Sequence, residues 1–376
     1  MKYIIAICSI FAATINIFAM KKSFICIAFA AMALVSCSKN ELGKAGDTVK
    51  ELKTDFYTMT VNSDAGFENF LNEGGASSTD ELAEYLSNML SAGPFGKLEC
   101  APQTGDFACS ALHVANPSGS QMLGRNFDWD NCKAMVIRSF PKNAYASIST
   151  SNLDFLGFGE DYEPKGMINQ YKATAAVYVP MDGINEKGVV IADLMAGDKE
   201  LTDQNDESKK NLTTTTAIRL VLNYAADVDE ALSLLRQYNI HSDIGSAHHF
   251  IIADAKGTSV AVEWTGGEMK VTPTDVLNNH YLCSEKQGIG SGEESWAHEA
   301  KLLELRAAGD GVMDSEELTD AMFEVLSLPD GSYYGGTQWT IVYDLAECSA
   351  TYHWRRDRAE WFRFFAGKDI TANGKK

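Results

Sequence analysis

The sequence has few basic residues for its size. Lysine and arginine together number 32 against 51 aspartates and glutamates, which gives a net charge of −19. Proteins that bind nucleic acid need a basic face, and no stretch of this chain resembles a basic groove. The composition therefore argues against a nucleic-acid partner.

Motifs for metals and nucleotides are also missing. The cysteines show no CxxC spacing, which argues against a structural zinc site. The glycine-rich run at 288–292 has no strand-to-helix setting, so it predicts neither a phosphate-binding loop nor a nucleophile elbow. The adjacent His248 and His249 lie on a predicted strand and point to opposite faces, which does not suit chelation of one metal. We expect no cofactor and no metal.

No uninterrupted apolar run near the start reaches the roughly 18 residues that a membrane-spanning helix needs. Met1 and Met20 are both plausible starts, and the apolar run after Met20 ends in Leu34-Val35-Ser36-Cys37. This segment resembles a bacterial lipoprotein signal, in which the cysteine is lipidated and becomes the new N-terminus. We therefore predict a signal segment over 1–36 and an extracytoplasmic protein of the cell envelope, periplasmic or associated with the outer membrane, whose membrane contact is a lipid anchor on Cys37.

The next two segments precede the main domain. Residues 37–53 are polar and charged, which predicts a linker. Between residues 54 and 108 one helix is expected, because a capping box at Ser78–Glu81 precedes apolar residues at helical spacing and Gly93-Pro94 ends the pattern.

The cysteine count indicates a free thiol. Of eight cysteines, Cys8 and Cys26 lie in the leader and Cys37 takes the lipid, so five remain. An odd number outside the cytoplasm leaves at least one unpaired, and Cys109 is our candidate. The others are expected either to pair in one of three ways or to stay buried and reduced; they are Cys100, Cys132, Cys283 and Cys348.

The order of elements predicts the fold class. Several antiparallel hairpins are expected, with helices grouped between them and no internal repeat. This order fits an α+β layered sandwich and does not fit alternating βαβ units.

The hairpin at 109–130 gathers reactive side chains. Asn116-Pro117-Ser118-Gly119 has the residues of a type I turn. If Asn116 pairs with Gly119, Cys109 lies opposite Asn126, and a thiol, Arg125 and Asp128 meet at one end of two strands. Which face each occupies stays open, because a slip of one residue flips every side chain.

These residues resemble a known family. Three features are similar to the linear amide C–N hydrolases. They are Cys109-Ser110, the spacing of sixteen residues from Cys109 to Arg125 within Gly-Arg-Asn-Phe-Asp, and the run Asp182-Gly-Ile-Asn-Glu-Lys-Gly188. That family of Ntn hydrolases includes choloylglycine (bile salt) hydrolases, penicillin V acylases and the acid ceramidase group. The resemblance implies a four-layer αββα sandwich of two mainly antiparallel sheets. It also implies a catalytic domain over 109–376 and a prosegment over 54–108.

The resemblance also implies roles for five residues. Cys109 becomes the first residue of the mature chain after self-cleavage of Ala108–Cys109, and its α-amine serves as the base for its own thiol. Arg125 favours the thiolate and Asp128 holds the α-amine. Asn185 and Asn279 are the candidate donors to the oxyanion, although asparagine also occurs at turns and in loops for backbone reasons. The expected substrate is a small N-acyl amide, such as a bile-salt conjugate or an N-acyl amine.

Two alternatives stay open. A papain-like enzyme would pair Cys109 with His248, His249 or His280, although Cys109 precedes a hairpin and the residues around it lack the papain context. A lipoprotein of the same fold could instead bind an apolar acylated ligand without catalysis. Bile salt hydrolases carry an arginine shortly before a Thr-Gln-Tyr/Trp strand, whereas residues 331–336 here contain none, which weakens a bile-salt assignment. Whether the chain forms a homo-oligomer is also open.

Overall fold

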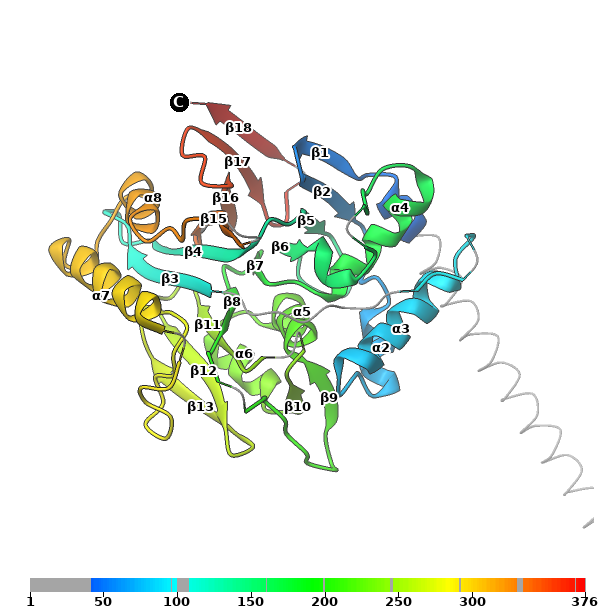
Figure 1. The fold of residues 1–376 in the computed structure, drawn as a ribbon, viewed down its shortest axis with the longest axis horizontal. Coiled ribbons are helices and arrows are strands. Elements are labelled where there is room, and N and C mark those ends of the chain that lie inside the picture. Colours follow the sequence, from blue (N-terminus) through cyan, green and yellow to red (C-terminus); the bar gives the residue numbers. More distant parts are fainter. Residues whose placement is uncertain are drawn as a thin grey trace, which may run out of the picture.

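The computed structural model describes residues 42–95, 97–99, 108–159, 161–198, 200–243, 246–290, 292–329, 334–368 and 370–375. Two large β-sheets pack against each other through a shared core, and helices cover their outer faces (Figure 1). The predicted α+β class, with its four-layer αββα sandwich of mainly antiparallel sheets, is therefore confirmed.

The first sheet has nine strands within the described residues, in the order β1-β2-β5-β6-β7-β8-β11-β12-β13. These are β1 (Lys50–Lys53), β2 (Phe56–Val61), β5 (Ala134–Ser139), β6 (Ser147–Asn152), β7 (Asp182–Asn185), β8 (Val190–Met195), β11 (His248–Ala253), β12 (Ser259–Thr265) and β13 (Glu268–Pro273). Neighbouring strands are antiparallel except β2 and β5. Strands β5 to β8 and β11 are buried along their whole length, because both faces of the sheet are covered.

The second sheet has seven antiparallel strands among the described residues, in the order β14-β3-β4-β15-β16-β17-β18. These are β14 (Val276–Leu277), β3 (Ala108–Ala115), β4 (Gln121–Asp130), β15 (Tyr334–Asp344), β16 (Ser349–Trp354), β17 (Glu360–Phe365) and β18 (Thr371–Lys375). The chain crosses from β4 to the first sheet and returns much later at β14 and β15, so residues far apart in sequence surround β3 and β4.

Helices form the outer layers. The first sheet carries α2 (Phe67–Glu73), α3 (Thr79–Ser91), η1 (Leu153–Leu156), α4 (Met167–Lys172), η2 (Ala173–Tyr178), α5 (Thr214–Tyr224) and α6 (Val228–Leu235), together with a small parallel pair, β9 (Lys210–Thr213) and β10 (Tyr238–His241). The second sheet carries α7 (Gly292–Ala308) and α8 (Ser315–Phe323). An added Cβ at Gly124 of β4 would lie 2.6 Å from Cγ of Met322, so glycine is what lets α8 lie directly on the sheet.

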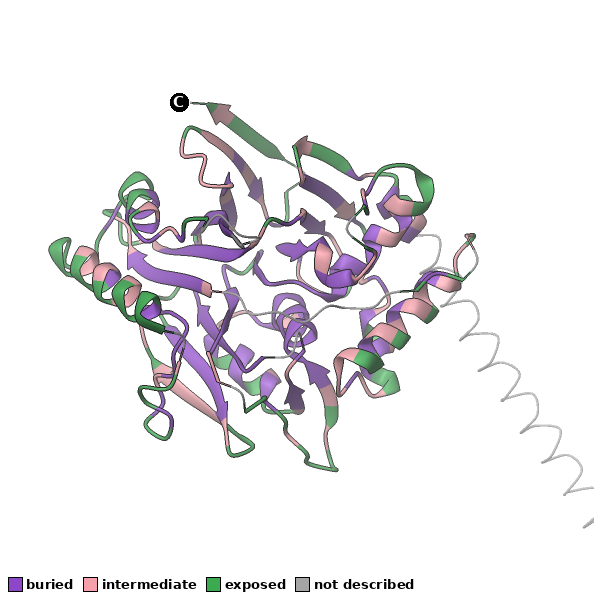
Figure 2. Ribbon diagram, viewed as in Figure 1, coloured by how far each residue is buried: buried purple, intermediate pink, exposed green. Residues whose placement is uncertain are grey.

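The core between the sheets positions the predicted site. Most residues of both sheets are buried, while the outer sides of α3 and α7 are exposed (Figure 2). Phe127 of β4 stacks on Trp339 of β15 with 4.0 Å between ring centroids, and Cys109 lies in this same inter-sheet core. The sulfur is therefore surrounded by rigid strands of both sheets.

The N-terminal part of the described chain differs from the prediction. Residues 50–53, expected in a linker, form the edge strand β1, in which the charged Lys50 and Glu51 are exposed as is typical of edges. The segment 54–108 has two helices and the strand β2 instead of one helix. Helix α2 went unpredicted because it is short and its N-cap, Gly66, offers no side-chain bond. The boundaries of the signal segment and Cys37 lie outside the described residues.

Two further observations concern the membrane and the thiols. No helix among the described residues is long and apolar enough to cross a membrane. Four of the predicted free or paired cysteines are described, and all four are unpaired: Cys109, Cys132, Cys283 and Cys348. Cys100 lies outside the described residues. Of the two expectations, disulfide pairing or reduced thiols, the second holds for the four cysteines that are described.

Candidate active site

The β3–β4 hairpin forms as predicted, but its register is shifted by one residue. The Gly119 N–H donates to the Asn116 carbonyl at 2.8 Å, and the Asn116 N–H donates to the Ser120 carbonyl at 2.7 Å. Gly119 has φ of 87°, so the loop is a type I turn followed by a left-handed glycine that adds one residue to the connection. Cys109 consequently lies opposite Phe127, and the predicted pairing with Asn126 is wrong.

This register decides which side chains share a face. Cys109 and Arg125 both point into the inter-sheet core. Asp128 lies opposite Ala108 and takes the other face, where its carboxylate accepts hydrogen bonds from Thr337 Oγ1 at 2.6 Å and Ser327 Oγ at 2.8 Å. The predicted contact of Asp128 with the nitrogen of Cys109 is therefore not formed in the uncleaved chain.

Arg125 is completely buried, and each of its guanidinium nitrogens lies close to an acceptor. Nη1 is 3.3 Å from Sγ of Cys109, Nη2 donates to the carbonyl of Asp193 at 2.8 Å, and Nε is 2.9 Å from Oδ2 of Asp182. Asp182 in turn accepts hydrogen bonds from Trp339 and Tyr343, each at 3.0 Å. The guanidinium is thus fixed against the sulfur by an ion pair behind it.

Asp182 was missed by the sequence interpretation, although its signal was present. It begins the Asp182–Gly188 run that carried the resemblance, but the asparagine of that run drew the assignment instead. A buried arginine next to a thiol requires a buried anion, and the acidic residue of the run is the one that supplies it.

The thiol of Cys109 is neutral in the uncleaved chain. Burial is the strongest influence and raises the pKa of Cys109 to about 12, the positive charge of Arg125 opposes this, and the carboxylates of Asp128 and Asp193 add to it. At neutral pH the sulfur therefore needs a base before it can act as a nucleophile.

The backbone nitrogen of Cys109 also has a dedicated partner. It donates to Oδ1 of Asn279 at 2.6 Å, and Nδ2 of Asn279 donates to the carbonyl of Met195 at 2.8 Å. The sequence placed Asn279 at the site, and the structure brings it there. Asn279 was predicted to donate to an oxyanion, however, whereas in the structure its Oδ1 accepts from the backbone nitrogen of Cys109.

A family model for the linear amide C–N hydrolases, choloylglycine hydrolase family, matches residues 109–280. The resemblance stated from the sequence is thus confirmed over these residues, which are similar to the model of that family. The predicted enzyme class, a hydrolase acting on linear amide C–N bonds, is confirmed. The match begins at Cys109, and it contains Arg125, Asp182 and Asn279.

Similar solved structures come from two bacteria. Penicillin V acylase from Agrobacterium tumefaciens is 18% identical over 65% of this chain and 83% of its own, with a TM-score of 0.47. A mutant of conjugated bile acid hydrolase from Clostridium perfringens is 16% identical over 71% of this chain and 92% of its own, with a TM-score of 0.47. No curated protein sequence matches this chain.

Asn185, the other predicted oxyanion donor, has a different role. Its Nδ2 donates to the carbonyls of Leu222 and Ala225 at 3.2 and 2.7 Å, and its Oδ1 accepts from the N–H groups of Lys187 and Val189. All hydrogen-bonding positions of the amide are used in joining a turn to the end of α5. The structure therefore does not bring Asn185 to Cys109.

The papain-like alternative is not supported by the contacts of its three candidate histidines in the described part of the chain. The three candidate histidines contact other groups: His248 with Asp193, His249 with Glu263, and His280 with Ser295. The sulfur instead contacts Arg125, as the choloylglycine hydrolase resemblance implies.

Asp128 gives the domain a pH-dependent stability. Burial raises its pKa from 3.8 to about 6, although the hydroxyl donors Thr337 and Ser327 act in the opposite direction. Because the folded state binds this proton more tightly than the unfolded chain, the contribution of Asp128 to stability is present below about pH 4 and is lost as the pH rises through about 6. We expect wild type to lose stability relative to Asp128→Asn between these values. Urea unfolding at both pH values measures the difference, and a constant difference would contradict the prediction.

Proposed function

We propose that the protein is a self-cleaving amidase in which Cys109 supplies both the nucleophile and, through its α-amine, the base. One observation carries the proposal: the sulfur and the nitrogen of the same residue each have a buried partner, Arg125 at 3.3 Å and Asn279 at 2.6 Å. A cysteine that served only to fill the core would need neither. That the family match begins at Cys109 supports the same view.

Cleavage of Ala108–Cys109 is the first step of the proposed mechanism. The sulfur attacks the carbonyl carbon of Ala108, the C–N bond breaks, and the nitrogen takes up the proton lost by the thiol. Ala108 is then held as a thioester, which water hydrolyses to a carboxylate and a free thiol. The step leaves Cys109 with an α-amine that did not exist before, and its pKa near 7.7 to 8 suits a base at neutral pH.

Amide hydrolysis then uses the same two atoms. The α-amine takes the thiol proton, the sulfur attacks the acyl carbon, and the departing amine receives the proton from the α-ammonium. Water hydrolyses the resulting thioester and restores the thiol. Arg125 stabilises the anionic sulfur throughout, and Asn279 holds the α-amine beside it through its carbonyl oxygen.

The N-terminal fragment should remain bound after cleavage. Six residues of β2 pair with β5, and Phe56 is buried in the inter-sheet core, where it stacks on Trp354 with 5.0 Å between ring centroids. Releasing it would expose this core and the unpaired edge of β5. We expect the two fragments to co-elute in size-exclusion chromatography under native conditions and to separate in denaturant. Elution of the C-terminal fragment alone would contradict this.

Replacing the two asparagines distinguishes their roles. Asn279→Ala removes the partner of the Cys109 nitrogen, so we expect kcat to fall about 10²-fold, the size of effect that misplacing a catalytic group produces. Asn185→Ala removes bonds that join a turn to α5, so we expect a lower melting temperature with unchanged kcat of the folded protein. Kinetics and thermal unfolding of both variants test this. A large loss of kcat in Asn185→Ala alone would reverse the assignment.

We propose that the substrate is a small N-acyl amide. The lack of arginine in residues 331–336 weakens the case for bile-salt conjugates. A panel of penicillin V, glycine-conjugated bile acids, N-acyl amino acids, N-acyl ethanolamines and N-acyl lactones, scored for amine release, tests the proposal. Binding without turnover of any member would favour the non-catalytic alternative.

We also propose that the mature protein is anchored in the cell envelope through a lipid on Cys37. The supporting pattern is Leu34-Val35-Ser36-Cys37 after an apolar run. Metabolic labelling with an azido fatty acid should mark wild type and not Cys37→Ser. Equal labelling of both would refute the anchor.

A further inference from the structure

The end of β8 holds the side chains of Arg125 and Asn279, which contact the sulfur and the nitrogen of Cys109. The backbone ladder between β7 and β8 ends where the Asp193 N–H donates to the carbonyl of Met181 at 2.8 Å. Beyond this point side chains replace a neighbouring strand. The carbonyl of Asp193 accepts from Arg125, and the carbonyl of Met195 accepts from Asn279. The carbonyls of Asp193 and Met195 lie two residues apart on the same edge of β8. They therefore position Arg125 beside the sulfur and Asn279 beside the nitrogen of Cys109.

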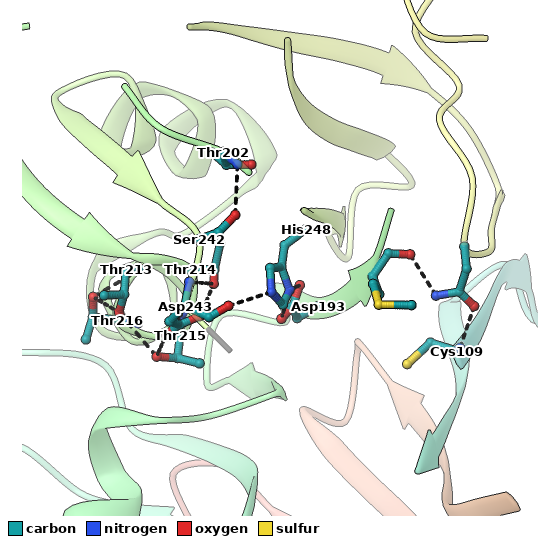
Figure 3. Close-up of polar contacts among 12 residues, drawn as sticks. Cys109, Asp193, Thr202, Thr213, Thr214, Thr215, Thr216, Ser242, Asp243 and His248 are labelled. Carbon is teal, nitrogen blue, oxygen red and sulfur yellow. Dashed lines mark hydrogen bonds and ion pairs between the residues drawn. The ribbon is translucent and has the colours of Figure 1, made fainter. Parts of the chain in front are cut away.

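The side chain of Asp193 fastens this strand end from the opposite face. Its two oxygens lie 3.1 and 2.9 Å from Nδ1 of His248, the first residue of β11 (Figure 3). Nε2 of His248 lies 2.9 Å from the carbonyl of Asp243. The carboxylate of Asp243 accepts hydrogen bonds from the hydroxyls of Thr214 and Thr215 at the start of α5. Figure 3 shows this series of contacts running from α5 to β8, with Cys109 beyond.

The partners of His248 define its state. A carbonyl oxygen only accepts, so Nε2 carries a proton, and Nδ1 faces the carboxylate of Asp193. Burial lowers the pKa of His248, but the charges of Asp193 and Asp243 outweigh this and raise it. All of these side chains are buried, so the arrangement is costly to break and is able to hold β8 in one position.

We propose that His248 is a positioning residue for the hydrolase: by holding Asp193, it fixes the end of β8, whose carbonyls keep Arg125 and Asn279 against Cys109. The proposal rests on the proposed function of Cys109, since positioning matters only if the sulfur reacts. It adds a residue on the helix side of the first sheet that acts on the site through the backbone of β8.

Two replacements of His248 separate its two contacts. In His248→Gln the side-chain amide nitrogen takes the place of Nε2, so the variant keeps the contact with the Asp243 carbonyl but loses the contact with the Asp193 carboxylate. In His248→Asn the amide nitrogen takes the place of Nδ1, so the variant keeps the contact with the Asp193 carboxylate but loses the contact with the Asp243 carbonyl. We expect the glutamine variant to show a rate of Cys109 alkylation by iodoacetamide at pH 8 about tenfold lower than wild type, because Arg125 no longer supports the thiolate. The asparagine variant should stay within about threefold.

His241→Gln is the matched control. His241 is also a buried histidine bonded to a carboxylate, Asp203 at 2.7 Å, but it lies on β10 and has no connection to Arg125. Cys109 of the His241→Gln variant should be alkylated as fast as Cys109 of wild type. A merely structural loss at His248 would loosen the core and speed alkylation, which is opposite to the expected change.

Turnover provides the second measurement. On penicillin V or a glycine-conjugated bile acid, the glutamine variant should lose at least about tenfold in kcat with KM within threefold. Equal or faster alkylation in His248→Gln than in His248→Asn overturns the positioning role. If the glutamine variant does not fold, Asp193→Ala takes its place in the same comparison. Failure of wild type to hydrolyse any amide refutes the proposed function and leaves the alkylation result to decide this inference separately.

Discussion

Cys109→Ala is expected to remain uncleaved at Ala108–Cys109 and to lower amide hydrolysis by about 10³-fold or more. The methyl group cannot form a thioester, and without cleavage the residue has no free α-amine. One substitution therefore removes the nucleophile and the base together. Mass spectrometry of the intact chain reports the first effect, and amine release from the panel of amides reports the second.

Cys132→Ala is the control for this prediction. Cys132 is also buried in the inter-sheet core, and burial raises the pKa of its thiol as it does for Cys109. Its sulfur lies 3.9 Å from Oε1 of Gln338 and has no catalytic partner assigned to it. We expect cleavage and hydrolysis within about twofold of wild type. A cleaved and active Cys109→Ala chain would end the proposal for Cys109.

The sequence was sufficient to predict that Cys109 and Arg125 lie near each other on one hairpin, and the family resemblance predicted their contact. In the observed register Arg125 lies two residues from Phe127, the residue opposite Cys109, so the two side chains share a face. The layered class was also predictable, because hairpins and grouped helices leave signals within short windows of sequence. Both features depend on residues that are close together in the sequence.

The face of each side chain was not predictable. Asn116-Pro117-Ser118-Gly119 is compatible with a tight turn and with a turn that adds a left-handed glycine, and the two differ by one residue in register. That residue places Asp128 on the helix side instead of beside Cys109. The choice depends on the packing of β4 against β15 and α8, which come about 200 residues later.

The roles of the asparagines depended on tertiary contacts. Asn185 caps its own turn but is fixed by carbonyls at the end of α5, and Asn279 reaches Cys109 from 170 residues away. Neither contact leaves a mark in the neighbouring sequence. The same holds for β2, whose parallel pairing with β5 joins segments that no hairpin links. His248 likewise shows its connection to the site only through the backbone of β8.

Arg125→Met should damage stability and activity together. It leaves the carboxylate of Asp182 buried without its counter-charge, and losing one partner of a buried ion pair costs about 3 to 5 kcal/mol. It also removes the cation at 3.3 Å from the sulfur, so we expect kcat to fall about 10²-fold or more. Denaturant unfolding and kinetics measure the two effects separately.

A second replacement distinguishes the structural from the chemical effect of Arg125. In Arg125→Met with Asp182→Asn no buried charge is left unpaired, so we expect much of the unfolding free energy to return. Hydrolysis and cleavage should not return, because the sulfur still has no cation beside it. Recovery of activity together with stability would show that Arg125 serves the fold alone. Recovery of stability by itself would assign the guanidinium to the thiolate, with Asp182 holding it there.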